Sequence, residues 1–317
     1  MNEFDVLIVG GGAAGLSAAL VLARALRSVV VIDAGNPRNA PAAHMHGFLG
    51  SDGLPPATLL AAARREVTGY GARVVPGTVT AIGPSADLPS ADGPRFEIAL
   101  EAAQVLTARR VLVSTGLTDD VPDIPGVRER WGRDLLHCPY CHGYEVRDEP
   151  LGVLGGSDDA VAHAHLVRQW SDDVVYFSNG TSPAAEQLER LQARGIRLVE
   201  GVVARLVISA DRLTGVELAS GEVVARTAVF VRPRLLPNAG LLSSLGCATD
   251  PNGWVSVDSA GRTSVPGVFA AGNAVNPRAQ VITAAGEGSA AAIAINNDLV
   301  EEDVSITVAH AHPDLTP

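Results

Sequence analysis

Residues 6–15 read VLIVGGGAAG, a continuous apolar run that ends in a cluster of glycines. An unbroken run of Val, Leu and Ile is typical of a parallel strand that is buried on both faces. The glycines have the spacing of a dinucleotide-binding turn. In that turn Gly10 provides the tight bend, Gly12 lets a pyrophosphate approach the backbone, and Gly15 allows close packing of the following helix. The stretch predicts a nucleotide-binding strand–turn–helix unit at the start of the chain.

The residues that follow complete this unit. A helix rich in small residues is predicted over 16–26, and residues 29–33 read VVVID, a second apolar strand that ends at Asp33. An acid at this place is suited to bind a ribose hydroxyl. Strand, glycines, helix, strand and acid together predict a Rossmann-like unit.

The same pattern restarts at residues 152–160, which read GVLGGSDDA, with a helix predicted to about residue 170. Ser157 stands in the place of the second glycine, where its side chain crowds the pyrophosphate. The next strand ends in the tripeptide FSN at residues 177–179. That tripeptide offers neither an acid for the ribose of NAD nor an arginine for the phosphate of NADP. A second nucleotide-type fold is predicted, and tight binding of NADPH or NADH by it is doubtful.

A pair of thiols lies just before this second unit, in the sequence HCPYCHGYE that begins at His137. Cys138 and Cys141 can form a disulfide if Cys138 begins a helix, because one turn brings their Cβ atoms within reach. Pro139 suits the first helical position. The helix dipole would then favour a thiolate and lower the pKa of Cys138. His137 and His142 are candidate proton donors or acceptors. The pattern indicates a dithiol that cycles between its two redox states.

Three other interpretations compete with this one. A structural disulfide is disfavoured in a chain with 3 cysteines and no secretory signal. A zinc half-site would need two further ligands, for which only Cys247 and histidines such as His163 and His165 are candidates. A glutaredoxin-like domain uses the same motif, but there the motif follows the first strand of a small domain. Redox activity remains the favoured interpretation, and no metal is expected.

The composition limits the partners. The net charge is −11, which argues against nucleic acid or an anionic membrane surface. The first predicted strand begins near residue 4, so we expect no signal peptide, and the glycines and arginines within residues 6–32 argue against a transmembrane helix. A soluble cytoplasmic protein is expected.

Other segments complete the predicted architecture. An apolar strand over 110–116 ends in small residues, and a strand over 263–273 ends beside a polar side chain. Residues 280–288 open the last helix, whose N-terminus would face the cofactor. A hairpin tip is predicted at 84–94, and a crossover between two domains at 233–237.

The order of these motifs resembles the low-molecular-weight thioredoxin reductase family over essentially the whole chain. The resemblance implies an α/β fold with two Rossmann-like nucleotide-binding domains of the three-layer ββα type. An FAD domain, residues 1–116 and 240–317, would be interrupted by a smaller NAD(P)-type domain, residues 117–239, that carries the CxxC motif. The family also implies a homodimer.

The resemblance assigns roles to matching residues. Cys141 would lie against the flavin, and Cys138 would be the interchange thiol that meets the substrate. The FAD-binding positions include Val79 at the adenine and Gln280 and Val281 near the isoalloxazine. The full set is Gly10, Gly12, Ala13, Ala14, Gly15, Asp33, Ala34, Gly35, Arg38, Asn39, His46, Val79, Thr115, Gly116, Asn273, Gln280 and Val281.

The chain departs from ordinary thioredoxin reductases at four places. His142 replaces an acid, Asn273 replaces an Asp that binds the ribityl chain, Ser157 replaces a glycine, and the basic segment that grips NADPH is absent at 177–179. The motif CPYCHGYE and residues 39–48 instead resemble the dithiol oxidases that make the disulfides of gliotoxin and holomycin.

Three functions are therefore in competition. The first is an FAD-dependent dithiol oxidase that converts a small natural-product dithiol into an intramolecular disulfide with O2 as electron acceptor. The second is a thioredoxin reductase-like disulfide reductase that uses NAD(P)H, acts on a thioredoxin-like protein and rotates its domains about hinges near 116–119 and 236–239. The third is a non-catalytic flavin-binding protein. The first is the favoured hypothesis, with His137 or His142 moving the protons.

Overall fold

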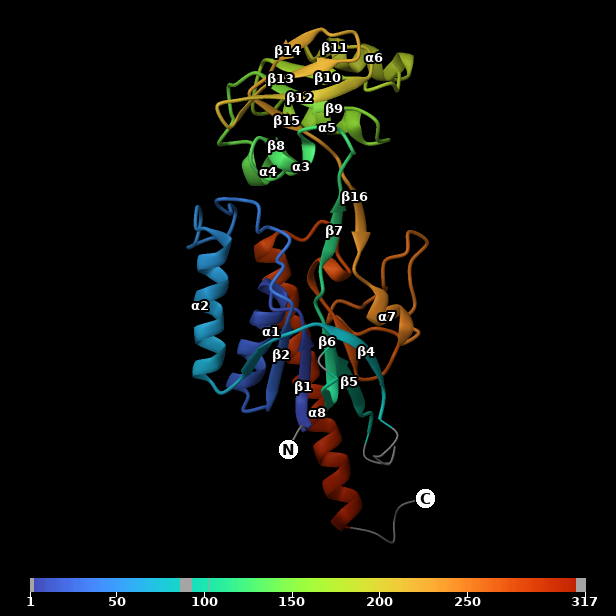
Figure 1. The fold of residues 1–317 in the computed structure, drawn as a ribbon. Coiled ribbons are helices and arrows are strands. Elements are labelled where there is room, and N and C mark those ends of the chain that lie inside the picture. Colours follow the sequence, from blue (N-terminus) through green and yellow to red (C-terminus); the bar gives the residue numbers. More distant parts are fainter. Residues whose placement is uncertain (1–2, 86–92, 102, 312–317) are drawn as a thin grey trace.

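The computed structural model describes residues 3–85, 93–101 and 103–311. It shows two lobes stacked end to end (Figure 1). Two strands connect them, β7 (Leu117–Asp120) and β16 (Arg234–Pro237), which pair antiparallel with Leu117 opposite Pro237. The chain passes up β7 into the smaller lobe and returns through β16, so the larger lobe is built from both ends of the described chain.

The larger lobe is formed around one sheet of order β3-β2-β1-β6-β5-β4, with β17 also paired to β6. Strands β1, β2, β3, β6 and β17 run parallel, and β4, β5 and β6 pair antiparallel. The strands are β1 (Glu3–Val9), β2 (Val29–Asp33), β3 (Arg73–Pro76), β4 (Val79–Pro84), β5 (Phe96–Leu100), β6 (Val105–Val113) and β17 (Val268–Ala270). The helices are α1 (Ala13–Arg24), α2 (Pro56–Gly69), α7 (Gly240–Ser244), the 3-10 turn η2 (Gly272–Ala274) and α8 (Val281–Ala311).

Both faces of this sheet are buried, as the unbroken apolar run predicts. Val6 and Ile8 of β1 pack in a core with α1 and α8, while Leu7 and Val9 point to the opposite face and its separate core. Small residues along α1 allow α8 to lie close to it (Figure 1). This packing sets the first turns of α1 and α8 at the edge of the lobe that faces the smaller lobe (Figure 1).

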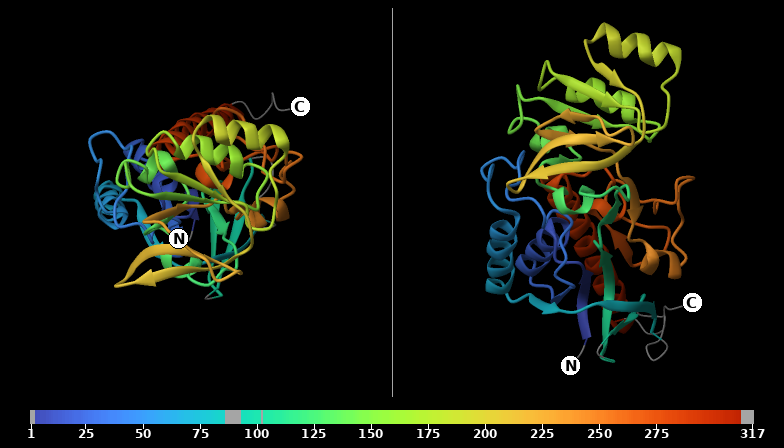
Figure 2. Two further views of the ribbon diagram at one scale, coloured as in Figure 1. Left: turned by 90° about the horizontal axis from the view of Figure 1, so that it is seen from above. Right: turned by 45° about the horizontal axis from the view of Figure 1, so that its top comes forward.

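The smaller lobe has three layers. A sheet of order β11-β10-β9-β15-β8 lies between helices α5 and α6 on one face and the small sheet β12-β13-β14 on the other (Figure 2). Its strands are β8 (Leu135–Leu136), β9 (Leu151–Leu154), β10 (Val174–Phe177), β11 (Arg197–Val199), β12 (Val203–Ser209), β13 (Arg212–Leu218), β14 (Val223–Ala225) and β15 (Ala228–Phe230). Its helices are α3 (Val127–Arg130), α4 (Pro139–His142), α5 (Ala160–Val167) and α6 (Ala185–Ala193).

The predicted α/β class is confirmed, with some changes in detail. The strand predicted over 263–273 is short, β17 at Val268–Ala270, because the chain turns at Gly267 (φ 78°) before it and at Gly272 (φ 69°) into η2 after it. Residues 86–92 of the predicted hairpin tip lie outside the described residues, and the strands on either side pair antiparallel. The strands β7 and β16 that connect the lobes lie near the predicted domain boundaries at 116/117 and 239/240. The division into two domains at these residues stays a prediction. Across the described ranges, no helix is long and apolar enough to cross a membrane.

Candidate active site

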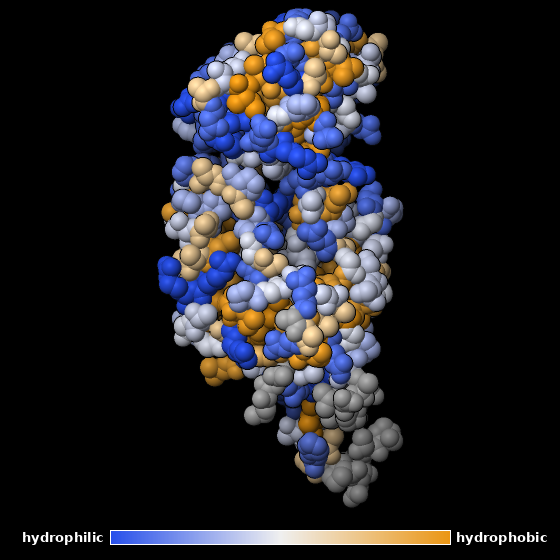
Figure 3. Space-filling view, in the orientation of Figure 1, coloured by the Kyte–Doolittle hydropathy of each residue, from blue (hydrophilic) through white to orange (hydrophobic). Residues whose placement is uncertain are grey.

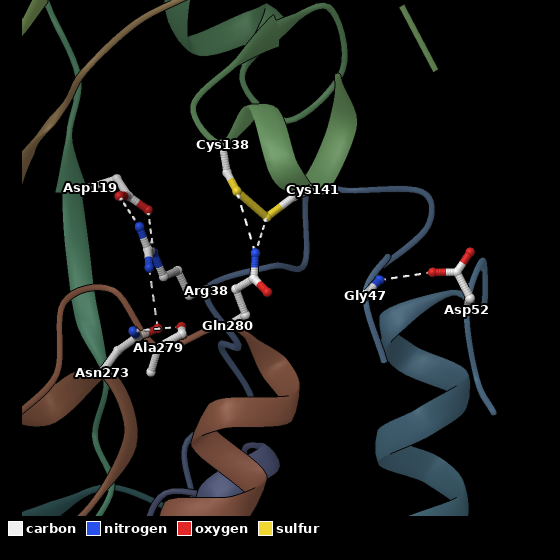
Figure 4. The surroundings of a disulfide bond; sticks show 9 residues. All are labelled: Arg38, Gly47, Asp52, Asp119, Cys138, Cys141, Asn273, Ala279 and Gln280. Atoms are coloured by element: carbon white, nitrogen blue, oxygen red, sulfur yellow. Dashed lines mark hydrogen bonds and ion pairs between the residues drawn. A yellow bond between two sulfur atoms is a disulfide. The ribbon is translucent and has the colours of Figure 1, made fainter. Parts of the chain in front are cut away.

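The two cysteines lie on the face of the smaller lobe that looks toward the larger one, where a disulfide joins Cys138 to Cys141 (Figure 4). Cys138 is extended and precedes α4, and Pro139 is its first helical residue. The N–H of Cys141 donates to the carbonyl of Cys138 at 3.1 Å, which closes the turn and sets the Cα atoms 5.2 Å apart. This is the local arrangement that the motif predicts.

The larger lobe reaches the sulfur pair through Gln280, the residue before α8. Its Nε2 lies 3.7 Å from Sγ of Cys141 and 4.0 Å from Sγ of Cys138 (Figure 4). The predicted isoalloxazine neighbour Gln280 is thus in contact with both sulfurs. Val281 follows it as the first residue of α8.

Arg38 links the same region to the connection between the lobes. Its Nε and Nη2 donate to the carboxylate of Asp119, each at 2.7 Å, and its Nη1 donates to Oδ1 of Asn273 at 3.2 Å (Figure 4). Asn273 in turn donates from Nδ2 to the carbonyls of Asn276 (2.9 Å) and Ala279 (3.0 Å). The sequence predicts roles for Arg38 and Asn273 but not for Asp119. Nothing in the sequence of β7 indicates that Arg38, in the distant loop after β2, binds Asp119.

His46 and His142 meet at the edge of the sulfur pair, with ring centroids 6.4 Å apart. Nδ1 of His46 lies 3.3 Å from Asp52, and its Nε2 lies 3.5 Å from Glu145 in the smaller lobe. Burial lowers the pKa of His142, and the charge of His46 acts in the same direction against that of Glu145. His142 is therefore a neutral base at neutral pH. Glu145 was not selected from the sequence, although it lies three residues after His142 in the quoted motif.

His137 directly precedes Cys138 in the chain. Its ring stacks on that of Trp131, with the ring centroids 6.5 Å apart. Within the described ranges its Nδ1 is buried without a hydrogen-bond partner. Its pKa is lowered, first by burial and then by the positive charge of Arg38. Both predicted histidines therefore flank the cysteines in their neutral form.

The first glycine turn has the shape that a dinucleotide requires. A Cβ at Gly10, where φ is 102°, would lie 2.5 Å from the carbonyl oxygen of Ser114, and one at Gly15 would lie 2.0 Å from that of Gly10. At Gly12, in contrast, no described atom lies within 4 Å of such a Cβ. Backbone contacts thus fill two of the three positions, and space is left only where a pyrophosphate would approach. The N–H groups of the first turn of α1, at Ala13, Ala14 and Gly15, have no intrahelical partners, and such a helix N-terminus suits a pyrophosphate.

Asp33 is held beside this turn. Burial alone would raise the pKa of Asp33, but hydrogen bonds from Arg64 (2.6 Å) and from the N–H of Gly35 (3.1 Å) outweigh it and lower the pKa. The carboxylate is therefore ionised and can accept from a ribose hydroxyl. Arg64 of α2 was missed, because one charged residue on a helix surface does not reveal a partner in the sequence.

The other predicted FAD-binding residues also lie around this edge of the lobe. Ala34 and Gly35 follow β2, and Asn39 closes a loop turn through its carbonyl, which accepts from Ala42 at 3.1 Å. The N–H of Gly77 donates to the carbonyl of Asp33 at 3.0 Å, which brings the segment of Val79 to the end of β2. Thr115 donates from its hydroxyl to Asn238 at 2.8 Å, and Gly116 turns with φ at 70°. The donor set, the ionised acid and the open position at Gly12 fit FAD.

The second glycine turn opens onto a polar crevice of about 970 Å³. Four carboxylates line it, at Asp120, Asp123, Asp158 and Asp159, together with three arginines. Two of the arginines are paired within it, Arg232 with Asp159 at 3.0 Å and Arg234 with Asp120 at 2.8 Å. The crevice therefore offers little positive charge to a pyrophosphate.

No zinc half-site is assembled in the part of the chain that the structure describes, where no group of three or more His, Cys, Asp or Glu lies close enough to hold a metal ion. Cys247 is buried, and burial raises the pKa of its thiol. It packs as a small apolar residue far along the chain from the redox pair.

Comparison with known proteins identifies the family. A family model described as pyridine nucleotide-disulphide oxidoreductase matches residues 4–288. Thioredoxin reductase tcpT of Claviceps purpurea is 35% identical over 283 residues, which cover 86% of this chain and 87% of that protein. Thioredoxin reductase sirT of Leptosphaeria maculans is 30% identical over 317 residues, 95% of this chain and 96% of that protein. The crystal structure of HlmI is similar with a TM-score of 0.96 and 55% identity, covering 99% of this chain and 98% of that chain.

These matches confirm the family and the cofactor predicted from the sequence. The enzymes of this family are FAD-dependent flavoproteins, and the part of the chain that would hold FAD has the geometry to do so. The chain belongs to the pyridine nucleotide-disulphide oxidoreductase family and is a thioredoxin reductase-like enzyme.

Proposed function

We propose that this protein is an FAD-dependent dithiol oxidase that converts a small-molecule dithiol, of the kind found in natural products, into an intramolecular disulfide. The observation that carries the proposal is the contrast between its two nucleotide-type sites. The first keeps an open pyrophosphate position in the lobe that contacts the disulfide through Gln280, and the second has Ser157 in place of its second glycine and is lined by carboxylates. Electrons can therefore enter at the sulfur pair without a nicotinamide.

The first step is thiol–disulfide exchange at Cys138. A substrate thiolate attacks Sγ of Cys138, a new S–S bond forms between substrate and Cys138, and the Cys138–Cys141 bond breaks with its electron pair on Sγ of Cys141. The second thiolate of the same substrate molecule attacks its own sulfur in this mixed disulfide. The cyclic product leaves, and both cysteines remain reduced.

His142 and His137 are the candidate acceptors of the protons that the substrate thiols lose. Each is neutral because burial lowers its pKa, so each can accept a proton from a substrate thiol and produce the attacking thiolate. His142 has the stronger support, because the neighbouring charge with the largest effect on its pKa is the carboxylate of Glu145, which outweighs His46 and favours the protonated form. At His137 the largest such effect comes from Arg38, which opposes protonation more strongly than Asp119 favours it. When bound, FAD would supply the removal of an electron pair from the reduced Cys138 and Cys141, which restores their disulfide, and the transfer of that pair with two protons to O2, which leaves as hydrogen peroxide.

A second candidate is the reductase that uses NAD(P)H and acts on a thioredoxin-like protein. The size of the crevice in the smaller lobe, about 970 Å³, favours it, as do the relatives that carry the name thioredoxin reductase. The paired arginines and the four carboxylates of the crevice speak against it, because they disfavour a ligand with several phosphate charges.

The two functions differ in the electron donor and in whether oxygen is consumed: the oxidase consumes O2 with a dithiol alone, and the reductase needs NAD(P)H. We expect the purified flavoprotein to take up O2 when given small dithiols alone, and addition of NADPH to leave the rate unchanged. The measurement is steady-state oxygen consumption with a panel of dithiols, with and without NADPH, and with Cys138→Ser as the control. Reduction of a thioredoxin-like protein by NADPH, without oxygen uptake from dithiols, would favour the reductase.

A homodimer is also part of the proposal. The far end of α8 extends beyond the larger lobe (Figures 1 and 3). It exposes an apolar row, Val300, Val304 and Val308, to solvent. Its spacing is that of one helix face. Sedimentation equilibrium of wild type and of Val304→Asp would test whether this row contributes to the dimer.

A further inference from the structure

The side chain of Gln280 is the feature of the larger lobe that contacts the sulfur pair, and its orientation is fixed by chemistry. A disulfide sulfur has lone pairs and no proton, so it can only accept a hydrogen bond. The amide group that faces Cys141 at 3.7 Å and Cys138 at 4.0 Å is accordingly the NH2 group. The amide oxygen points the other way, toward Gly47.

We propose that Gln280 is a catalytic residue whose amide N–H stabilises the thiolate of Cys141, and that Asn273 positions it. This inference rests on the proposed exchange at the sulfur pair. When the substrate sulfur bonds to Cys138, the Cys138–Cys141 bond breaks and its electron pair stays on Sγ of Cys141. The sulfur that gains the charge is the one closer to Nε2. A hydrogen bond to an anion is stronger than one to a neutral sulfur, so the contact favours the charged product of this step.

The backbone around Gln280 supports the same role. The carbonyl of Gln280 accepts from the N–H of Ala284 at 2.8 Å, so Gln280 immediately precedes the long helix α8. The helix N-terminus carries partial positive charge, which adds to the stabilisation of a nearby anion. The amide is thus presented from the residue that directly precedes the first turn of a long helix.

Asn273 fixes the loop that carries this residue. Its Oδ1 accepts from Arg38, and its Nδ2 donates to the carbonyl of Ala279, the neighbour of Gln280 (Figure 4). The same Nδ2 also donates to the carbonyl of Asn276. A single side chain can accept and donate in this way only if it is an amide, since an ionised Asp has no proton to donate. This gives a physical reason for Asn rather than Asp at position 273.

The test measures one thiol and needs neither a dithiol substrate nor oxygen. In FAD-loaded Cys138→Ser protein, the rate of alkylation of Cys141 by iodoacetamide is followed across pH by mass spectrometry. Adding Gln280→Met, which keeps the length but removes the donor, should shift the profile to higher pH and slow alkylation about ten-fold on its acid side. Gln280→Lys, which restores an N–H donor, should return the rate at least to its original value. Asn273→Asp should give a smaller shift in the direction of Gln280→Met.

The matched control is Gln192→Met, the same exchange on the exposed surface of α6, which should leave the profile unchanged. If Gln280→Met does not fold by circular dichroism, Gln280→Glu replaces it and should slow alkylation further, because its carboxylate repels a thiolate. An unchanged Cys141 profile in the Gln280 variants would overturn the inference, as would a shift that Lys does not reverse. Since no turnover is measured, this result is independent of whether the oxidase proposal holds.

Discussion

The turns after β1 and β9 start in the same way and then diverge. Gly10 donates its N–H to Ile32 at 2.8 Å, and Gly155 donates to Phe177 at 2.7 Å. In the first turn Gly10 itself has a positive φ of 102°, whereas in the second the corresponding value, 103°, belongs to Gly156, one residue later. Helix α1 begins directly after Gly12, but α5 begins only after residues 155–159, so the second turn is longer and ends in two carboxylates.

The ends of the second strands differ as well. Asp33 at the end of β2 turns its carboxylate toward the glycine turn, where a Cβ at Gly11 would lie 2.5 Å from it. After β10, Ser178 accepts from the N–H of Gly201 (3.1 Å), and Asn179 accepts from that of Val203 (3.1 Å). These side-chain oxygens hold the segment that leads into strand β12, and neither residue offers the carboxylate that Asp33 provides for a ribose. The comparison shows that the same fold can retain a ligand site in one lobe and use the equivalent positions for internal packing in the other.

The largest effect is expected from closing the open position of the first turn. Gly12→Val should lower the affinity for FAD about 100-fold or more, because its side chain fills the space left for the pyrophosphate. The melting temperature of the FAD-free protein should change little, since no described atom lies within 4 Å of the new Cβ. The same exchange in the second turn, Ser157→Val, should leave the flavin content unchanged. Flavin absorbance per chain measures both, and a yellow Gly12→Val protein with normal affinity would break the comparison.

The next effect concerns acid stability of the smaller lobe. His163 of α5 is 3% exposed, and its pKa is lowered to about 3, first by burial and then by the charge of Arg232. Protonation below the unfolded value of 6.5 therefore favours the unfolded chain, and the free energy of unfolding falls as pH drops from 6.5 toward 3. At pH ~4.5 this amounts to at most about 3 kcal/mol.

We expect His163→Leu to reduce that loss. Urea unfolding at neutral and acid pH measures it, with the exposed His44→Leu as control. If His163→Leu and wild type lose the same free energy on acidification, burial of His163 is not the cause of acid sensitivity.

A smaller effect is expected from removing carboxylates at the second turn. Asp158→Asn with Asp159→Asn should raise the affinity for NADPH about ten-fold, because two negative charges beside the phosphates are lost and Arg232 is released from its ion pair. Equilibrium dialysis would measure it. The control is Glu186→Gln with Glu189→Gln on α6, which makes the same charge change in the same lobe. An equal gain in the control would mean that overall charge, and not the crevice, limits NADPH binding.

The smallest effect lies where the lobes meet. Glu145 raises the pKa of His142 against the lowering by burial, so Glu145→Gln should lower that pKa further. The neutral form of His142 then persists to lower pH, and the acid limb of the exchange rate should move down by a few tenths of a pH unit. Single-turnover rates with a dithiol across pH measure it, with Glu149→Gln as control. An acid limb that moves upward would contradict the assignment of His142 as the base.

Much of this could be predicted from the sequence, because the decisive signals are local. Gly10, Gly12, Gly15 and Asp33 define the first turn by spacing alone, and Cys138 with Pro139 defines the start of α4. The small residues of α1 and α8 likewise predict close helix packing.

The rest depends on contacts between distant segments. The pairs Asp119 with Arg38 and Arg64 with Asp33 join residues far apart in the chain, and no spacing reveals them. The strand predicted over 263–273 is short because glycine turns limit it on both sides, at Gly267 before β17 and at Gly272 on the way to α8. The sequence shows that Ser157 replaces a glycine of the second turn. That this turn is longer than the first becomes visible only from the positions at which α1 and α5 begin.

The central claim is that electrons enter through Cys138 and Cys141 rather than through the crevice of the smaller lobe. The most direct test is an anaerobic stopped-flow titration of the flavin absorbance, in which a small dithiol and NADPH are supplied separately. We expect prompt bleaching by the dithiol, recovery of the colour on admission of air, and no bleaching by NADPH at micromolar concentrations. Rapid bleaching by NADPH together with no response to dithiols would contradict it.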